Sequence, residues 1–141
     1  MGGYDPSLVT SKTYGDRRPV EGEIVALLHI TFKERGIKLI DARSRAMLRG
    51  EIHELMTTDE ETAAPGGGAN RVSAIAFFEV EVGGIAVVDD DVLLGDELLG
   101  KVAGFDMTHM PNHMNLLVKV LTFKESSIGV GEKLTIRRPH I

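Results

Sequence analysis

Three side chains suited to catalysis or metal binding lie close together between residues 104 and 115. They are Asp106, His109 and His113, separated by three and four residues. An imidazole titrates near neutral pH, so one of these histidines can transfer protons while the carboxylate orients it. Two imidazoles and a carboxylate can also bind a divalent ion such as zinc, iron, manganese or nickel. We therefore predict Asp106, His109 and His113 as catalytic residues, with a divalent metal as the candidate cofactor.

A metal site needs a further ligand from elsewhere in the chain. His53 and Glu54 precede a long polar loop, and they are the best donors by chemistry. The predicted metal ligands are therefore His109, His113 and His53. His29 lies in the middle of an apolar stretch, which is more typical of a buried core histidine than of a ligand.

Other polar residues extend the predicted ligand site. Asn112 and Asn115 offer amide groups from the same segment as the two histidines. Gly67 lies among three successive glycines, whose backbone amides can surround an anion, and Arg71 supplies a positive charge nearby. A mobile lid is the alternative for this glycine-rich stretch, and both interpretations place it at the edge of the site. The predicted ligand-binding residues are His53, Asn112, Asn115, Arg71 and Gly67.

A structural interpretation of residues 104–115 stays open. Asp106, Thr108 and Asn112 are residue types whose side chains cap turns by bonding to nearby backbone groups. The segment also lacks a motif of fixed spacing such as His-Glu-x-x-His. In this interpretation the two histidines are partly buried and bonded to carbonyl groups.

Short apolar stretches separated by glycine and aspartate predict the elements that hold these residues. Residues 71–82 largely alternate between apolar and polar side chains, and residues 115–124 are apolar on both faces. The fold class is therefore mainly β, a small single-domain β-barrel or sandwich with at most one short helix. Residues 1–19 lack periodicity and are predicted as a flexible N-terminal arm, followed by one domain over residues 20–141.

Three connections carry specific expectations. Residues 41–49 begin with a helix-capping aspartate and precede Gly50, so they form either a short helix or a loop that leads into a strand. Residues 57–70 contain three successive glycines, so no regular element is expected there. Gly83 and Gly84 predict a hairpin turn between two paired strands.

The composition excludes several classes of function. The net charge of −5 argues against nucleic acid as a partner, because phosphate binding requires clustered lysine and arginine. The chain has no cysteine, which excludes thiolate nucleophiles and disulfides and fits a location in the cytoplasm. No apolar stretch approaches the roughly 18–20 residues that a membrane span requires, so no membrane association is expected.

Two functions follow from these patterns. The first is a small barrel that binds a small polar or anionic molecule at residues 106–115, with or without a divalent metal, as an enzyme or as a binding protein. The second is a non-catalytic homo-oligomeric interaction or regulatory module, in which the histidines are structural and some apolar strand residues form the interface.

Overall fold

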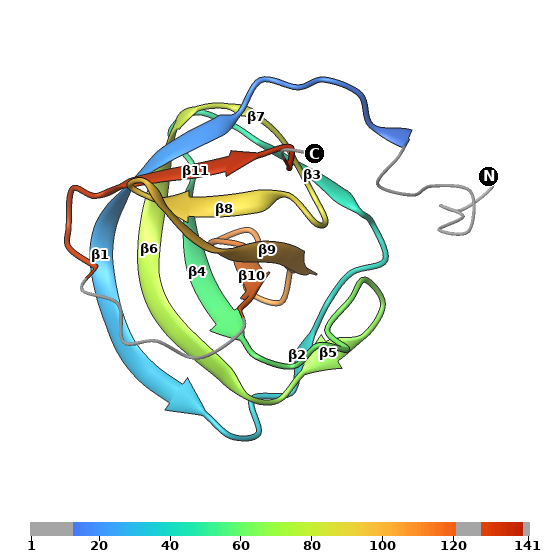
Figure 1. The fold of residues 1–141 in the computed structure, drawn as a ribbon. Helices are drawn as coiled ribbons and strands as arrows, with labels where there is room; N and C mark the ends of the chain where they lie inside the picture. Colours follow the sequence, from blue (N-terminus) through green and yellow to red (C-terminus); the bar gives the residue numbers. More distant parts are fainter. Residues whose placement is uncertain (1–12, 121–127, 140–141) are drawn as a thin grey trace.

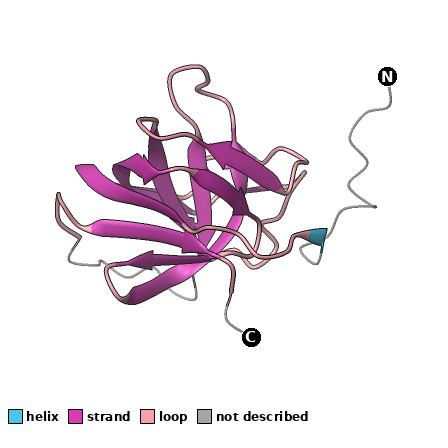
Figure 2. Ribbon diagram, turned by 90° about the horizontal axis from the view of Figure 1, so that it is seen from above, coloured by secondary structure: helices cyan, strands magenta, loops and turns pink. Residues whose placement is uncertain are grey.

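The structure is a computed structural model that describes residues 13–120 and 128–139. The described chain is mainly β and contains no α-helix, which confirms the predicted fold class. Figure 1 shows the strands curving around a common centre, and Figure 2 shows that strands and loops make up nearly all of the described chain. The strands are β1 (Val20–Phe32), β2 (Ile37–Lys38), β3 (Ser44–Met47), β4 (Ile52–Thr58), β5 (Gly68–Ala69), β6 (Val72–Val82), β7 (Gly84–Val87), β8 (Asp91–Leu94), β9 (Glu97–Asp106), β10 (Asn115–Lys119) and β11 (Lys133–Arg137).

Seven of these strands close into a barrel in the order β1, β11, β8, β9, β10, β4 and β6. β6 pairs with β1 to complete the ring, and β10 runs parallel to β4 beside otherwise antiparallel neighbours. The alternation in β6 positions its side chains as the sequence predicts. Ala76, Phe78 and Val80 are buried, whereas Glu79 and Glu81 are exposed.

The barrel interior is filled by apolar side chains. Each of the seven barrel strands contributes at least one residue to a single buried cluster, including Ile24, Leu55, Phe78, Phe105 and Leu116. Such packing uses the interior for stability, as is usual in small barrels. Polar chemistry is therefore carried by the outer face and the connections.

Residues 41–49 do not form a helix. Residues 44–47 within this range form β3, which pairs with β7, so neither the helix nor the loop describes the whole segment. Gly50 follows with a φ of 91°, in the left-handed region that favours glycine. Pairing with β7 satisfies the backbone groups that a helix would have satisfied internally, and Met47 is buried by it.

The prediction of a hairpin at Gly83 and Gly84 is wrong. Gly84 begins β7, which pairs with β3 and not with β6. The chain passes very close to β3 at this point, because a Cβ on Gly83 would lie 2.8 Å from the carbonyl oxygen of Met47. These glycines therefore permit a close crossing of two segments, a second common role for glycine in strands.

The glycine-rich stretch contains a short regular element, contrary to expectation. Gly68 belongs to β5, which pairs with β2 at Ile37 and Lys38. A Cβ on Gly68 would collide with the carbonyl oxygen of Ile37, so the absence of a side chain is what allows this pairing. A second apolar cluster lies against this small sheet and includes Ile37, Leu39, Met56, Ala69 and Leu117.

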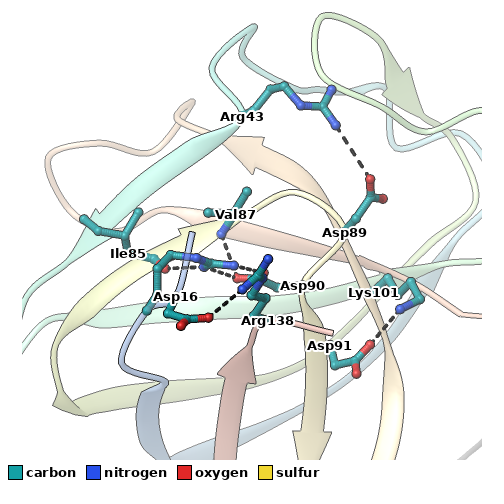
Figure 3. Close-up of polar contacts among 10 residues, drawn as sticks. Asp16, Arg43, Ile85, Val87, Asp89, Asp90, Asp91, Lys101 and Arg138 are labelled. Atoms are coloured by element: carbon teal, nitrogen blue, oxygen red, sulfur yellow. Dashed lines mark hydrogen bonds and ion pairs between the residues drawn. The ribbon is translucent and has the colours of Figure 1, made fainter. Parts of the chain in front are cut away.

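Part of the predicted N-terminal arm contacts the barrel. The guanidinium of Arg17 donates to both carboxylate oxygens of Asp90, at 2.6 and 2.8 Å, and Asp90 also accepts the N–H of Val87 (Figure 3). Asp16 pairs with Arg138 at 2.6 Å. Residues 1–12 lie outside the described residues. No helix in the described ranges is long and apolar enough to cross a membrane.

Candidate functional site

The site is built on the outer face of three adjacent barrel strands. Glu54 on β4 lies beside Asn115 on β10, which lies beside Asp106 on β9. Their chain neighbours Leu55, Leu116 and Phe105 belong to the barrel core. Since successive side chains in a strand point to opposite faces, Glu54, Asn115 and Asp106 point outward. Phe77 on β6 lies opposite Glu54 and extends this row across a fourth strand.

Residues 107–114 connect β9 to β10 and cover part of this row. The segment that carries both histidines is therefore a loop between two strands that are buried where it joins them. The connection consists of tight turns, in which the carbonyl of His109 accepts the N–H groups of Asn112 and His113, and it includes a cis peptide bond between Met110 and Pro111. Asp106 and Asn115 are 2% and 0% exposed although both point away from the core.

The carboxylate of Asp106 serves the connection and not the histidines. One oxygen accepts the backbone N–H and the hydroxyl of Thr108, and the other accepts the side-chain amide of Asn115 at 3.1 Å. These are the contacts of a turn-capping aspartate. Asp106 has no hydrogen bond or ion pair with His109 or His113, so the structure does not assemble the predicted carboxylate and imidazole pair.

His113 is instead held beside Glu54. Its Nε2 lies 3.2 Å from Oε1 of Glu54, and both side chains are 14% exposed. The amide of Asn112 donates to Nδ1 at 3.0 Å, which places the proton of the neutral ring on Nε2. The ring also packs edge-on against Phe77, with centroids 5.3 Å apart. We call Glu54, His109 and His113 the outer-face cluster.

His109 is the exposed member of the outer-face cluster. Its ring stacks on that of His113, with centroids 5.1 Å apart and an interplanar angle of 28°. The structure thus brings the two predicted histidines together. Nε2 of His113 is buried and, despite its distance from Glu54, has no hydrogen bond of good geometry. The Nε2 of His113 is therefore enclosed against the carboxylate of Glu54.

His53 is separate from this cluster and points into the barrel. It lies opposite Phe78, is 3% exposed, and accepts the backbone N–H of Met114 on Nδ1 at 3.0 Å. Its Nε2 lies 3.3 Å from Glu51. Burial is the main cause that lowers the pKa of His53, and the hydrogen bond to Glu51 opposes it. His53 is a neutral structural histidine, and both of its ring nitrogens are occupied.

The predicted metal set of His109, His113 and His53 is not brought together. Among residues 13–120 and 128–139, no three histidine, aspartate or glutamate side chains are grouped so as to hold a metal ion. The lone pair of His53 that could bind a metal already accepts a backbone N–H. His29 is exposed on β1, so the expectation that it is buried in the core is wrong.

Arg71 and Gly67 lie at the other end of β4. His53 is near the start of this strand and Thr58 ends it, roughly 17 Å away at about 3.3 Å per residue. The guanidinium of Arg71 donates to Asp59 at 2.9 Å. The N–H of Gly67 donates to the carbonyl of Ala64, so it is not free to bind an anion. These two predicted ligand-binding residues do not join the histidines, and the glycine-rich stretch does not cover them.

The two amides of the predicted set have different roles. Asn112 orients His113, whereas Asn115 is buried against Asp106, and its Oδ1 has no hydrogen-bond partner. The residue that the sequence undervalued is Glu54, considered only as a metal donor. Its signal was its position, one residue from the inward-facing Leu55 in a strand of otherwise uncharged residues apart from His53.

Comparison with known proteins identifies one family to which the chain belongs. The model of a family of unknown function, DUF6917, matches residues 14–137. No curated protein and no solved structure matches the chain. The match spans the whole barrel and the site, from the segment before β1 to the end of β11.

Proposed function

The chain belongs to the family of unknown function DUF6917, and we propose that it is a β-barrel that binds a small polar ligand at its outer-face cluster. The observation that carries the proposal is the pair formed by Glu54 and His113. A carboxylate and an imidazole are held 3.2 Å apart, largely shielded from water, with the second ring of His109 exposed beside them. Polar groups placed at a surface by rigid strands are typical of binding sites.

The charges around the cluster define the class of ligand. Glu54 and Asp106 are acidic, and residues 104–118 contain no lysine or arginine. Within the described chain, the ion-pair partner of Glu54 is His113. An anionic ligand would face the carboxylate of Glu54 without a lysine or arginine from this segment to pair with, whereas a neutral or cationic ligand would donate to Glu54. We therefore narrow the expected ligand from polar or anionic to neutral or cationic.

Each member of the cluster has a distinct part in this proposal. Glu54 accepts a hydrogen bond or pairs with a positive charge. His113 is fixed by Asn112 and Phe77, and its buried Nε2 lies against Glu54 and positions that carboxylate. His109 provides an exposed flat ring on which a planar ligand stacks. Such stacking and cation contacts with a ring contribute about 0.5–1.5 kcal/mol.

Three fragments of the same shape test the proposal. Benzamidine is cationic, benzamide is neutral and benzoate is anionic. Each is titrated into the ¹⁵N-labelled protein at neutral pH, and the backbone amide shifts are followed by NMR. We expect saturable shifts for residues 107–114 and Glu54 with benzamidine, weaker shifts with benzamide, and none there with benzoate.

Variants assign the response to the cluster. Glu54→Gln should remove the preference for benzamidine over benzamide, and His109→Ala should weaken both. His29→Gln is the matched control, because it replaces an exposed histidine on β1 that lies outside the cluster. Equal responses to all three fragments, or shifts that Glu54→Gln leaves unchanged, would contradict the proposal.

A homo-oligomeric interaction module is the second candidate, and one surface favours it. Ala46 on β3 lies directly opposite Ile85 on β7, and Leu48 follows two residues after Ala46. All three are exposed on one side of this two-stranded sheet. A second copy of the chain could cover this apolar face. Light scattering at several concentrations tests this candidate, since a monomer at all of them rules it out.

The proposed compartment is the cytoplasm. The chain has no cysteine and so forms no disulfide that would require an oxidising compartment. Its net charge of −5 favours solubility as a freely diffusing protein. Fractionation of cells that express the untagged chain tests this, and recovery in the membrane pellet would contradict it.

A further inference from the structure

A groove at the end of the barrel remote from the outer-face cluster is lined by charges of both signs. It has a volume of about 630 Å³. This volume falls within the range of roughly 300–1,000 Å³ that is typical of small-molecule sites. The lining residues are Lys33, Glu34, Asp59, Glu60, Glu61, Thr62, Asn70 and Arg71.

Three neighbouring strands hold this groove in place. Phe32 at the end of β1 pairs with Val72 at the start of β6, and Thr57 near the end of β4 pairs with Ser73. The lining residues follow or precede these strand ends directly. The turn after β1 and the connection from β4 to β6 are therefore brought side by side by the barrel itself.

Hydrogen bonds fix the backbone around Arg71. The carboxylate of Glu60 accepts the N–H groups of Asn70 and Arg71, at 3.0 and 2.6 Å. The hydroxyl of Thr58 donates to the carbonyl of Arg71 at 2.6 Å. The N–H of Arg35 donates to the carbonyl of Asn70 at 2.9 Å and links the two walls.

The charges of the groove separate into occupied and available groups. Glu60 is occupied by backbone N–H groups, and Asp59 accepts Nε of Arg71. The two terminal nitrogens of Arg71 and the ammonium of Lys33 remain available to an anionic group. The carboxylates of Glu34 and Glu61 have no side-chain hydrogen bond or ion pair within the described chain.

We propose that this groove is a second binding site, specific for a small zwitterion that carries a carboxylate and an ammonium group. The carboxylate would pair with the guanidinium of Arg71 and with Lys33. The ammonium group would pair with Glu34 or Glu61. A simple anion is disfavoured, because the lining has four acidic residues and two basic ones, a formal charge of −2. A free amino acid has both groups and fits the volume.

The test compares L-glutamine with acetate and ethylammonium, which carry only one of its charges each. All three are titrated into the ¹⁵N-labelled full chain, and the backbone amide shifts are followed by NMR. We expect L-glutamine to give saturable shifts at residues 33–35, 59–62 and 70–71. At the same concentration, neither single-charge probe should give saturable shifts there.

Substitutions assign the binding to named residues. Arg71→Gln should raise the dissociation constant for L-glutamine about tenfold, because a charged hydrogen bond is lost. Lys33→Gln should raise it up to about fivefold, as for an exposed ion pair. Lys101→Gln is the control, since Lys101 pairs with Asp91 away from the groove, and it should have no effect. Lys33 is exposed, so its variant keeps the test valid even where Arg71→Gln fails to fold.

Two outcomes would overturn the proposal. One is the absence of a saturable shift with L-glutamine at the groove residues. The other is an acetate response as strong as that of L-glutamine, which would make Arg71 a simple anion contact. The proposal does not depend on the outer-face cluster, because shifts at residues 107–114 and shifts at the groove are observed separately in the same spectra.

Discussion

Replacing His53 tests whether this histidine is structural or part of a ligand site. In the structure, Nδ1 of His53 accepts the buried N–H of Met114 at 3.0 Å, and the ring lies beside Phe78. Alanine removes the acceptor, which leaves an unpaired buried N–H at a cost of about 1–3 kcal/mol. Lost packing adds about 1–2 kcal/mol. We expect His53→Ala to lower the free energy of unfolding by about 2–5 kcal/mol.

The matched variant is His53→Asn. The side-chain oxygen of asparagine occupies nearly the same place as Nδ1, so the N–H of Met114 keeps its acceptor. We expect a loss of only about 1–2 kcal/mol, from the smaller volume and the lost contact with Glu51. Urea denaturation at pH 7.5 measures both variants. Equal losses for alanine and asparagine would refute the assigned hydrogen bond.

The same histidine makes stability depend on pH. Burial lowers the pKa of folded His53, so below the ordinary histidine value of about 6.5 the unfolded chain binds a proton that the folded chain does not. The contribution of His53 is therefore complete above pH 6.5 and is lost as the pH falls. The slope is at most about 1.4 kcal/mol per pH unit. This part of the dependence should be absent in His53→Asn between pH 7.5 and 5.5.

Two further changes test the fold around the site. Asp90→Asn should lower the free energy of unfolding by about 2–3 kcal/mol, because Arg17, whose side chain is only 14% exposed, would lose its buried carboxylate partner. Urea denaturation measures this change. A loss below about 0.5 kcal/mol would contradict the prediction. Gly68→Ala should cost about 2–3 kcal/mol, since its Cβ would collide with Ile37, whereas Gly129→Ala, with nothing within 4 Å, should be nearly neutral. Similar melting temperatures for the two alanine variants would show that Gly68 has room for a side chain.

The fold class was predictable from local patterns, but the strand partners were not. The alternation in β6 and the short glycine-bounded stretches specify strands, because side-chain direction repeats every two residues. Gly83 and Gly84 have the same local signature in a hairpin as in a close crossing. The hairpin and the close crossing differ only in whether β7 pairs with β6 or with β3, which lies some 40 residues earlier in the chain. Local periodicity does not show which strand is the partner.

At the site too, contacts within a short segment were predictable from the sequence, whereas contacts between distant strands were not. The capping role of Asp106 follows from contacts two residues away, and the sequence held both interpretations open. The role of Glu54 depends on the parallel pairing of β4 with β10, which joins residues 61 positions apart, Glu54 and Asn115.

The most direct test of the outer-face cluster is a crystal structure of the protein soaked with benzamidine. We predict electron density for the fragment with its amidinium within hydrogen-bonding distance of Glu54 and its ring against His109. Density confined to other surfaces, with Glu54, His109 and His113 unoccupied at saturating fragment, would contradict the assignment of this cluster as the ligand site.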